Sequence, residues 1–140
     1  MLGTQLRLPY QYIVRRIHAG LERAGFDDLR PAHYTVFQLI PDGGARSTEL
    51  ADAAQMTKQS MGALIDHLEE RGYVERVPDP ADGRARIVRL TSRGWDVVIA
   101  ARKCIAEVEA EWEQFLGGRR YDAFRTALGR INERAAADHR

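Results

Sequence analysis

The sequence has little of what marks secreted, membrane-spanning or disordered proteins. Its 140 residues include one cysteine, Cys104, which cannot form an internal disulfide, so a cytoplasmic setting is expected. No apolar run approaches the ~20 residues of a membrane-spanning helix, and the first residues contain no apolar core of a secretion signal. With 44% hydrophobic and 29% charged residues, the chain has the composition of an ordinary folded domain.

The sequence also lacks the patterns of catalysis and metal binding. Its four histidines have no metal-ligand spacing with one another or with Cys104. It contains no phosphate-binding glycine loop and no nucleophile elbow. The glutamates within 107–113 are typical of a solvated helix face and not of an acid–base pair. These absences argue against an enzyme, and we expect no cofactor and no bound metal.

Net charge is only +1, but the charges are unevenly distributed. Five arginines and two acids lie between Arg76 and Arg93, whereas residues 107–113 carry four glutamates and no basic residue. A nearly neutral protein with such a local arginine cluster can bind an anionic polymer on one face.

Apolar residues recur at three- and four-residue steps in six segments, and this spacing predicts helices. The predicted helices cover residues 8–24, about 31–40, 47–54, about 58–71, 92–116 and 119–137. Ser47 or Thr48 is the expected cap of the third helix and Thr57 that of the fourth. The first helix and the last two carry more apolar surface than a monomer of this size easily covers, which favours an oligomer.

The period changes between the fourth and fifth helices. Residues 73–77 and 87–91 are rich in β-branched side chains, and the residues between them have turn chemistry. They predict a hairpin with Arg84 near its tip. The expected fold class is therefore mostly α with a small β-hairpin, a winged helix-turn-helix flanked by N- and C-terminal helices.

This order of elements points to double-stranded DNA as the partner. The fourth helix has one apolar face and a polar first turn suited to the major groove. Arg84 is suited to a narrow minor groove, with Asp82 to orient its guanidinium. The candidate DNA-binding residues are Ser47, Thr57, Lys58, Gln59, Ser60, Arg76, Asp82, Arg84 and Arg86. The alternative is a winged helix that binds only proteins, with these polar residues as plain solvated positions.

Four motifs carry a family resemblance. They are STELA at 47–51, LIDHLEERGYVER at 64–76, DPADGR at 79–84 and LTSRG at 90–94. Together they closely resemble the MarR family of bacterial and archaeal regulators. The resemblance implies a homodimer, with residues 1–30 and 92–140 as its dimerisation region and residues 31–91 as the DNA-binding winged helix. It also implies a pseudo-palindromic operator, with repression as the commoner mode.

The chain departs from the family pattern in the region that would face DNA. Many relatives have a polar residue and an arginine where this chain has Gly62 and Ala63, and a second wing arginine where it has Gly83. We therefore expect few polar base contacts from the middle of the fourth helix, where contact with a thymine methyl is still open.

Family resemblance further implies a small phenolic or anionic effector bound between the dimer helices and the winged helix. The candidate ligand-binding residues are Tyr10, Arg16, His18, His33, Tyr34 and Trp95, with Arg16 as the anion partner. The alternative is that these aromatic residues belong to the core and that His33 only caps or bridges helices. For Cys104, a packing role is favoured over a redox role, because it lies mid-helix beside Ile105.

Overall fold

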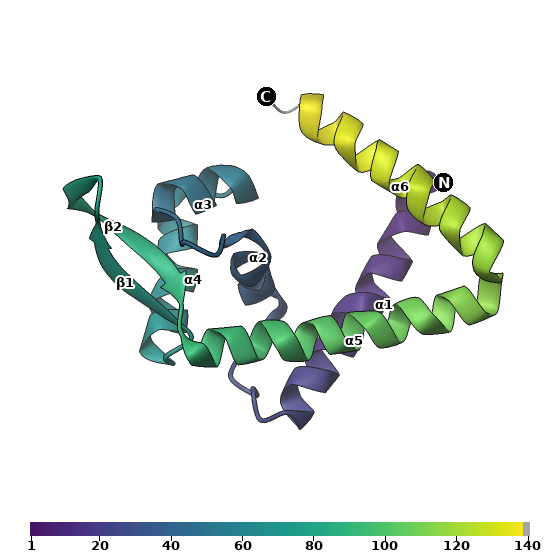
Figure 1. Ribbon diagram of the computed structural model, residues 1–140, viewed down its shortest axis with the longest axis horizontal. Coiled ribbons are helices and arrows are strands. Elements are labelled where there is room, and N and C mark those ends of the chain that lie inside the picture. Colours follow the sequence, from purple (N-terminus) through teal and green to yellow (C-terminus); the bar gives the residue numbers. More distant parts are fainter. Residues whose placement is uncertain (139–140) are drawn as a thin grey trace.

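The computed structural model describes residues 1–138, so His139 and Arg140 at the end of the predicted 92–140 region lie outside the described residues. The elements in order are α1 (Leu2–Arg23), α2 (Pro31–Leu39), α3 (Ser47–Ala54), α4 (Lys58–Glu70), β1 (Val74–Asp79), β2 (Asp82–Leu90), α5 (Ser92–Leu116) and α6 (Gly118–Asp138). Figure 1 shows the hairpin, α2, α3 and α4 gathered at one end of α5, with α6 leaving its other end. The predicted fold class is confirmed.

The helix boundaries follow local signals, with two corrections. Thr57 caps α4 as predicted, since its hydroxyl accepts the backbone N–H of Ser60 at 3.0 Å. The cap of α3 is Arg46, not Ser47 or Thr48, and it acts through its extended backbone without a side-chain hydrogen bond. Helix α1 begins at Leu2 rather than at residue 8 and continues through Pro9. Because Pro9 has no N–H, α1 lacks the hydrogen bond that would reach the carbonyl oxygen of Gln5.

The hairpin is longer than predicted. Strands β1 and β2 pair antiparallel from Val74 opposite Leu90 to Asp79 opposite Asp82, so most of the residues predicted as a loop belong to the strands. The register shifts between Pro78 and Asp79, as it does where a proline cannot donate to the ladder. On the other side of β2, Ala45 and Val88 exchange two backbone hydrogen bonds of 3.0 and 2.8 Å, which fasten the hairpin to the segment before α3.

The core lies where the winged helix meets α1 and α5. Its most buried large side chains are Leu21, Leu29, Val36, Leu50, Met61, Ile65, Leu68, Tyr73, Val74, Val88 and Val97. Gly94 has a structural requirement of its own, because a Cβ there would lie 2.1 Å from the carbonyl oxygen of Tyr73. This close approach of α5 to the start of β1 accounts for the glycine at the end of the LTSRG motif.

Apolar side chains are left exposed on the helices outside the winged helix. They are Met1, Leu2, Leu6, Leu8, Tyr10, Ile99, Phe115, Phe124 and Ile131. Helix α6 buries only Tyr121, and Gly117 with φ +82° separates it from α5 as predicted. Every helix among residues 1–138 is too short or too polar to span a lipid bilayer.

Candidate DNA-binding surface and ligand pocket

The first turn of α4 is exposed and polar. Thr57, Lys58, Gln59 and Ser60 are all exposed. The hydroxyl of Thr57 also donates to Ser60 Oγ at 2.9 Å, so these two side chains bind each other. Lys58 and Gln59 make no side-chain hydrogen bond within residues 1–138 and are the most available polar groups on this turn. Further along the helix, Ala63 is exposed and no atom lies within 4 Å of a Cβ built on Gly62.

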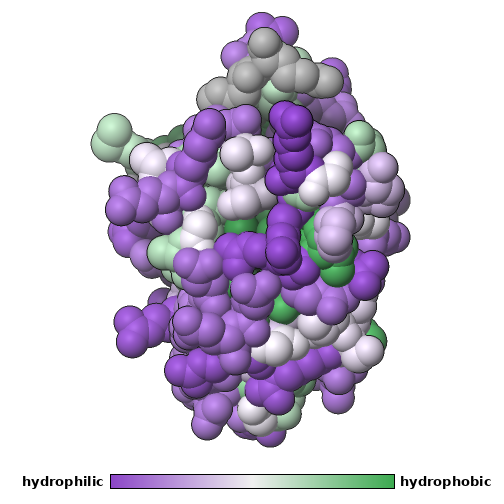
Figure 2. Space-filling model, turned by 90° about the vertical axis from the view of Figure 1, so that its left-hand side faces the viewer, coloured by the Kyte–Doolittle hydropathy of each residue, from purple (hydrophilic) through white to green (hydrophobic). Residues whose placement is uncertain are grey.

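The hairpin carries its arginines on a hydrophilic face. Arg84 and Arg86 are exposed and form no ion pair within the described residues, and Figure 2 shows that this side of the molecule is mostly hydrophilic. Asp82 Oδ1 accepts the backbone N–H of Arg84 at 3.1 Å. Asp82 therefore shapes the turn through the backbone of Arg84, and within the described residues it forms no ion pair with the guanidinium that it was predicted to orient.

Arg76 and Ser47 lie differently from the other candidates. The Arg76 guanidinium bridges Asp66 and Glu69 of α4, each at 2.7 Å, so its charge is already paired and it joins β1 to α4. Ser47 is the first residue of α3 and is half-buried. Among residues 1–138, no contact joins either side chain to the exposed polar turn of α4.

An ion pair beside the turn of the hairpin was not predicted from the sequence. Both Nε and Nη2 of Arg46 donate to Oδ2 of Asp79, at 2.9 and 2.6 Å, and the backbone N–H of Ala81 donates to Oδ1 at 2.9 Å. Asp79 is only 8% exposed. The Ala81 N–H and the Arg46 guanidinium hold the pKa of Asp79 below its usual value. No sequence pattern relates two residues that are 33 positions apart.

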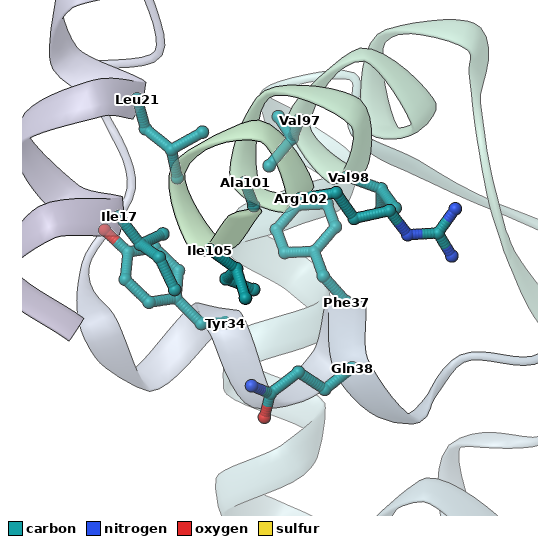
Figure 3. A pocket seen from close by; sticks show the side chains of 10 residues that line it. All are labelled: Ile17, Leu21, Tyr34, Phe37, Gln38, Val97, Val98, Ala101, Arg102 and Ile105. Carbon is teal, nitrogen blue, oxygen red and sulfur yellow. The ribbon is translucent and has the colours of Figure 1, made fainter. Parts of the chain in front are cut away.

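A pocket of about 200 Å³ lies between α1, α2 and α5 (Figure 3). Apolar side chains form most of its wall, with Tyr34 and Phe37 from α2 and Ile105 from α5. Besides Tyr34, the polar residues of the wall are Gln38 and Arg102, whose side chains extend away from the apolar ones in Figure 3. An apolar pocket with a few polar groups is the usual form of a small-molecule site.

Of the six predicted ligand residues, only Tyr34 lines this pocket. Its hydroxyl lies 2.8 Å from Nδ1 of His18, whose Nε2 is 3.2 Å from Glu22. Burial, with a smaller effect of Glu22, raises the pKa of Tyr34 to about 12, so the phenol stays protonated. His18 thus supports Tyr34 from outside the pocket wall.

The remaining four candidates are engaged elsewhere or exposed. Arg16 donates to Glu111 Oε2 at 2.7 Å, which makes it an α1–α5 link and not a free anion partner. Nδ1 of His33 accepts the backbone N–H of Arg30 at 2.9 Å, so His33 caps α2, which is the alternative given for it in the sequence analysis. Tyr10 is 61% exposed on α1, and Trp95 packs against the core.

No group of three or more His, Cys, Asp or Glu side chains in the described part of the chain could hold a metal ion. Cys104 is buried and packs against α1, since a Cβ on Gly20 would lie 2.1 Å from its Sγ. This contact agrees with the packing role predicted for the thiol.

Comparison with known proteins identifies the family. A family model described as "MarR family" matches residues 27–85. The transcriptional regulator HosA of Escherichia coli O111:H- is 35% identical over 98 residues, which cover 69% of this chain and 73% of HosA. The chain belongs to the MarR family.

Solved structures share this MarR fold over nearly the whole chain. The transcriptional repressor CouR bound to a 23-mer DNA duplex is 27% identical, with a TM-score of 0.73 over 94% of this chain and 92% of CouR. CouR from Rhodococcus jostii RHA1 bound to p-coumaroyl-CoA is 23% identical, with a TM-score of 0.70 over 93% of this chain and 90% of that one. The resemblance inferred from the four motifs is confirmed, and the protein is a winged-helix transcriptional regulator of the MarR family.

Proposed function

We propose that the protein is a cytoplasmic, homodimeric repressor that binds a pseudo-palindromic DNA operator and responds to a small effector. The observation that carries this proposal is the exposed polar turn at the start of α4 together with the exposed Arg84 of the hairpin, which has no ion pair among residues 1–138. CouR, which has this fold, is a repressor whose structure was solved on a DNA duplex.

In this proposal α4 enters the major groove. Its N-terminus favours phosphate or base acceptors, and Lys58 and Gln59 offer the donors. Arg84 enters the adjacent minor groove, where the negative potential attracts a guanidinium. Because Gly62 and Ala63 present no polar group, base readout rests mainly on the first turn of α4, with apolar contact to thymine methyls beyond it.

The dimer is proposed from the apolar surface of α1, α5 and α6. Phe115, Phe124 and Ile131 are exposed, with Phe115 at 87%. A groove between α5 and α6, lined in part by Trp112 and Leu128, continues this surface. An exposed apolar patch of this kind marks an interaction site. A second copy covering it makes residues 1–30 and 92–140 the dimerisation region and gives half-sites about 34 Å apart.

The effector site is proposed to be the pocket between α1, α2 and α5. Its apolar wall accepts an aromatic ring, and Arg102 near its edge offers a charge partner for a carboxylate. CouR, bound to p-coumaroyl-CoA in its solved structure, supports a phenolic acid or a conjugate of one as the ligand class. The pocket touches α2, which packs on α4, so a bound ligand can alter the position of the DNA-binding helix.

Selection of duplexes from a random pool tests the proposal. We expect enrichment of a two-fold symmetric sequence with half-sites about one helical turn apart. The purified protein should sediment as a dimer, and a panel of phenolic acids should include one that lowers its affinity for the selected duplex. A protein-interaction module would instead enrich no sequence from the pool.

A further inference from the structure

The hairpin is tied to the helix-turn-helix by the Arg46–Asp79 ion pair. Asp79 lies in β1 at the position where the register shifts, and Arg46 is the cap of α3. One carboxylate oxygen receives both guanidinium bonds, and the other receives the Ala81 N–H that closes the turn. The same nearly buried side chain therefore shapes the turn of the hairpin and attaches it to α3.

The hairpin is held at two points along its length. The Ala45–Val88 bridge fixes β2 to the segment before α3, and the Arg46–Asp79 pair fixes the end of β1 to the next residue of that segment. Beyond Asp79, the turn and Arg84 are exposed. The direction of the hairpin relative to α3 is thus fixed at two points, and Asp79, the outer one, lies next to the turn that precedes Arg84.

We propose that Arg46 and Asp79 are positioning residues, which fix the direction of the wing and thereby determine where Arg84 meets the DNA. This inference rests on the proposed DNA contact of Arg84. Arg46 and Asp79 act through Arg84 and need not touch DNA themselves. The Arg46–Asp79 pair should stay formed and hold the wing in one direction, because a nearly buried carboxylate that loses its cation is left without compensation for its desolvation.

The hairpin also provides a matched control. Arg89 Nε donates to Glu75 at 2.7 Å, but this pair joins the two strands of the hairpin and is exposed on both sides. Its removal leaves the attachment of the wing unchanged. A Glu75→Gln variant therefore loses one carboxylate charge from the same hairpin without loss of positioning.

The test is a double-mutant cycle on the duplex that the wild-type protein selects. Asp79→Asn keeps an oxygen for the Ala81 N–H and loses the charge that holds Arg46. We expect Asp79→Asn and Arg84→Ala each to lower affinity on the order of tenfold, and the double variant to be hardly weaker than either single one. Footprinting of Asp79→Asn should show loss of minor-groove protection with major-groove protection retained. Glu75→Gln should bind as the wild type does.

Each other result overturns the inference in a recognisable way. Independent, multiplicative losses mean that Asp79 does not act through Arg84, and unchanged affinity means that it positions nothing. Tighter binding by Asp79→Asn means that the freed Arg46 is a phosphate ligand. If Arg84→Ala alone binds normally, the proposed wing contact fails and the inference fails with it. Melting curves check that the variants fold. If Asp79→Asn does not fold, Arg46→Gln takes its place in the cycle, because Arg46 is the more exposed partner of the pair.

Discussion

The imidazole rings of His33 and His67 lie stacked, with centroids 4.3 Å apart and planes within 13° of parallel. Nδ1 of His33 accepts the backbone N–H of Arg30, and Nε2 of His67 donates to the carbonyl oxygen of Asp28, each at 2.9 Å. His33 must therefore be neutral to cap α2. Burial, followed by the charges of His67 and Arg30, lowers the pKa of His33 below 6.5.

This pair predicts a loss of stability in mild acid. Below pH 6.5 the unfolded chain takes up a proton on residue 33, whereas the folded chain does not until its lower pKa is reached. The free energy of unfolding should therefore fall as pH drops from about 7 to about 5. Thermal unfolding checks this against His33→Gln, whose amide can keep the cap but does not titrate. Equal pH slopes for the two proteins would refute the assignment.

Arg84→Ala should weaken DNA binding without altering the fold, because the side chain is exposed and has no ion pair within the described residues. If Arg84 replaces counterions along the minor groove, the slope of log affinity against log salt should fall by about 1. Titrations by fluorescence anisotropy at several salt concentrations measure the slope. Arg89→Ala is the control, since Arg89 is already paired with Glu75. An unchanged slope would remove the wing contact.

Gln59→Ala should affect recognition at one position of each half-site. Its side chain projects from the first turn of α4 and is exposed, so a base contact there is worth about 1–3 kcal/mol. Comparing wild-type and variant affinities across single-base variants of the selected duplex locates the effect. Gln114→Ala on α5 should change none of them. A uniform loss over all duplexes would make Gln59 a phosphate contact instead.

Gly20→Ala should destabilise the protein where α1 crosses α5. The added methyl would lie 2.1 Å from Sγ of Cys104, so the thiol must leave its position or one of the helices must shift. Overpacking of this kind costs about 1–3 kcal/mol, measurable by urea denaturation. Replacement of Cys104 by Ala in the same chain removes the sulfur and should restore most of the loss.

The matched control for Gly20 is Gly62→Ala. No atom lies within 4 Å of the position of its Cβ, so only the gain in helix propensity remains. This variant should be as stable as the wild type or slightly more so. A double variant at Gly20 and Cys104 that stays as unstable as Gly20→Ala alone would contradict the packing assigned to Cys104.

Most of the fold could be predicted from local patterns in the sequence. Hydrophobic periodicity placed the helices, and Thr57 and Gly117 marked a start and an end because caps and helix breaks depend on neighbouring residues alone. The strand ends could not be placed, because turn-forming residues such as Asp79 and Asp82 also pair across a tight hairpin. Their pairing depends on the opposite strand and not on their own propensity.

The site was only partly predictable for the same reason. The polar turn of α4 and the exposed Arg84 follow from local pattern, and the structure leaves both accessible. The partners of Arg46 and Arg16 lie 33 and 95 positions away in sequence, so only the folded chain reveals that these charges are paired. Helical spacing also cannot tell which aromatic residue faces the pocket, so Tyr10 was predicted beside Tyr34 although it is exposed.

Helix α5 begins only two residues after β2 ends and continues without interruption from Ser92 to Leu116. Its 25 residues make a rod about 37 Å long. A rotation of about 5° around the middle of such a rod moves each end by roughly 1.6 Å. A small molecule that tilted α5 against α1 would therefore move the hairpin end of this helix by that distance, while the pocket residues between Val97 and Ile105, nearer the middle of the helix, would move less.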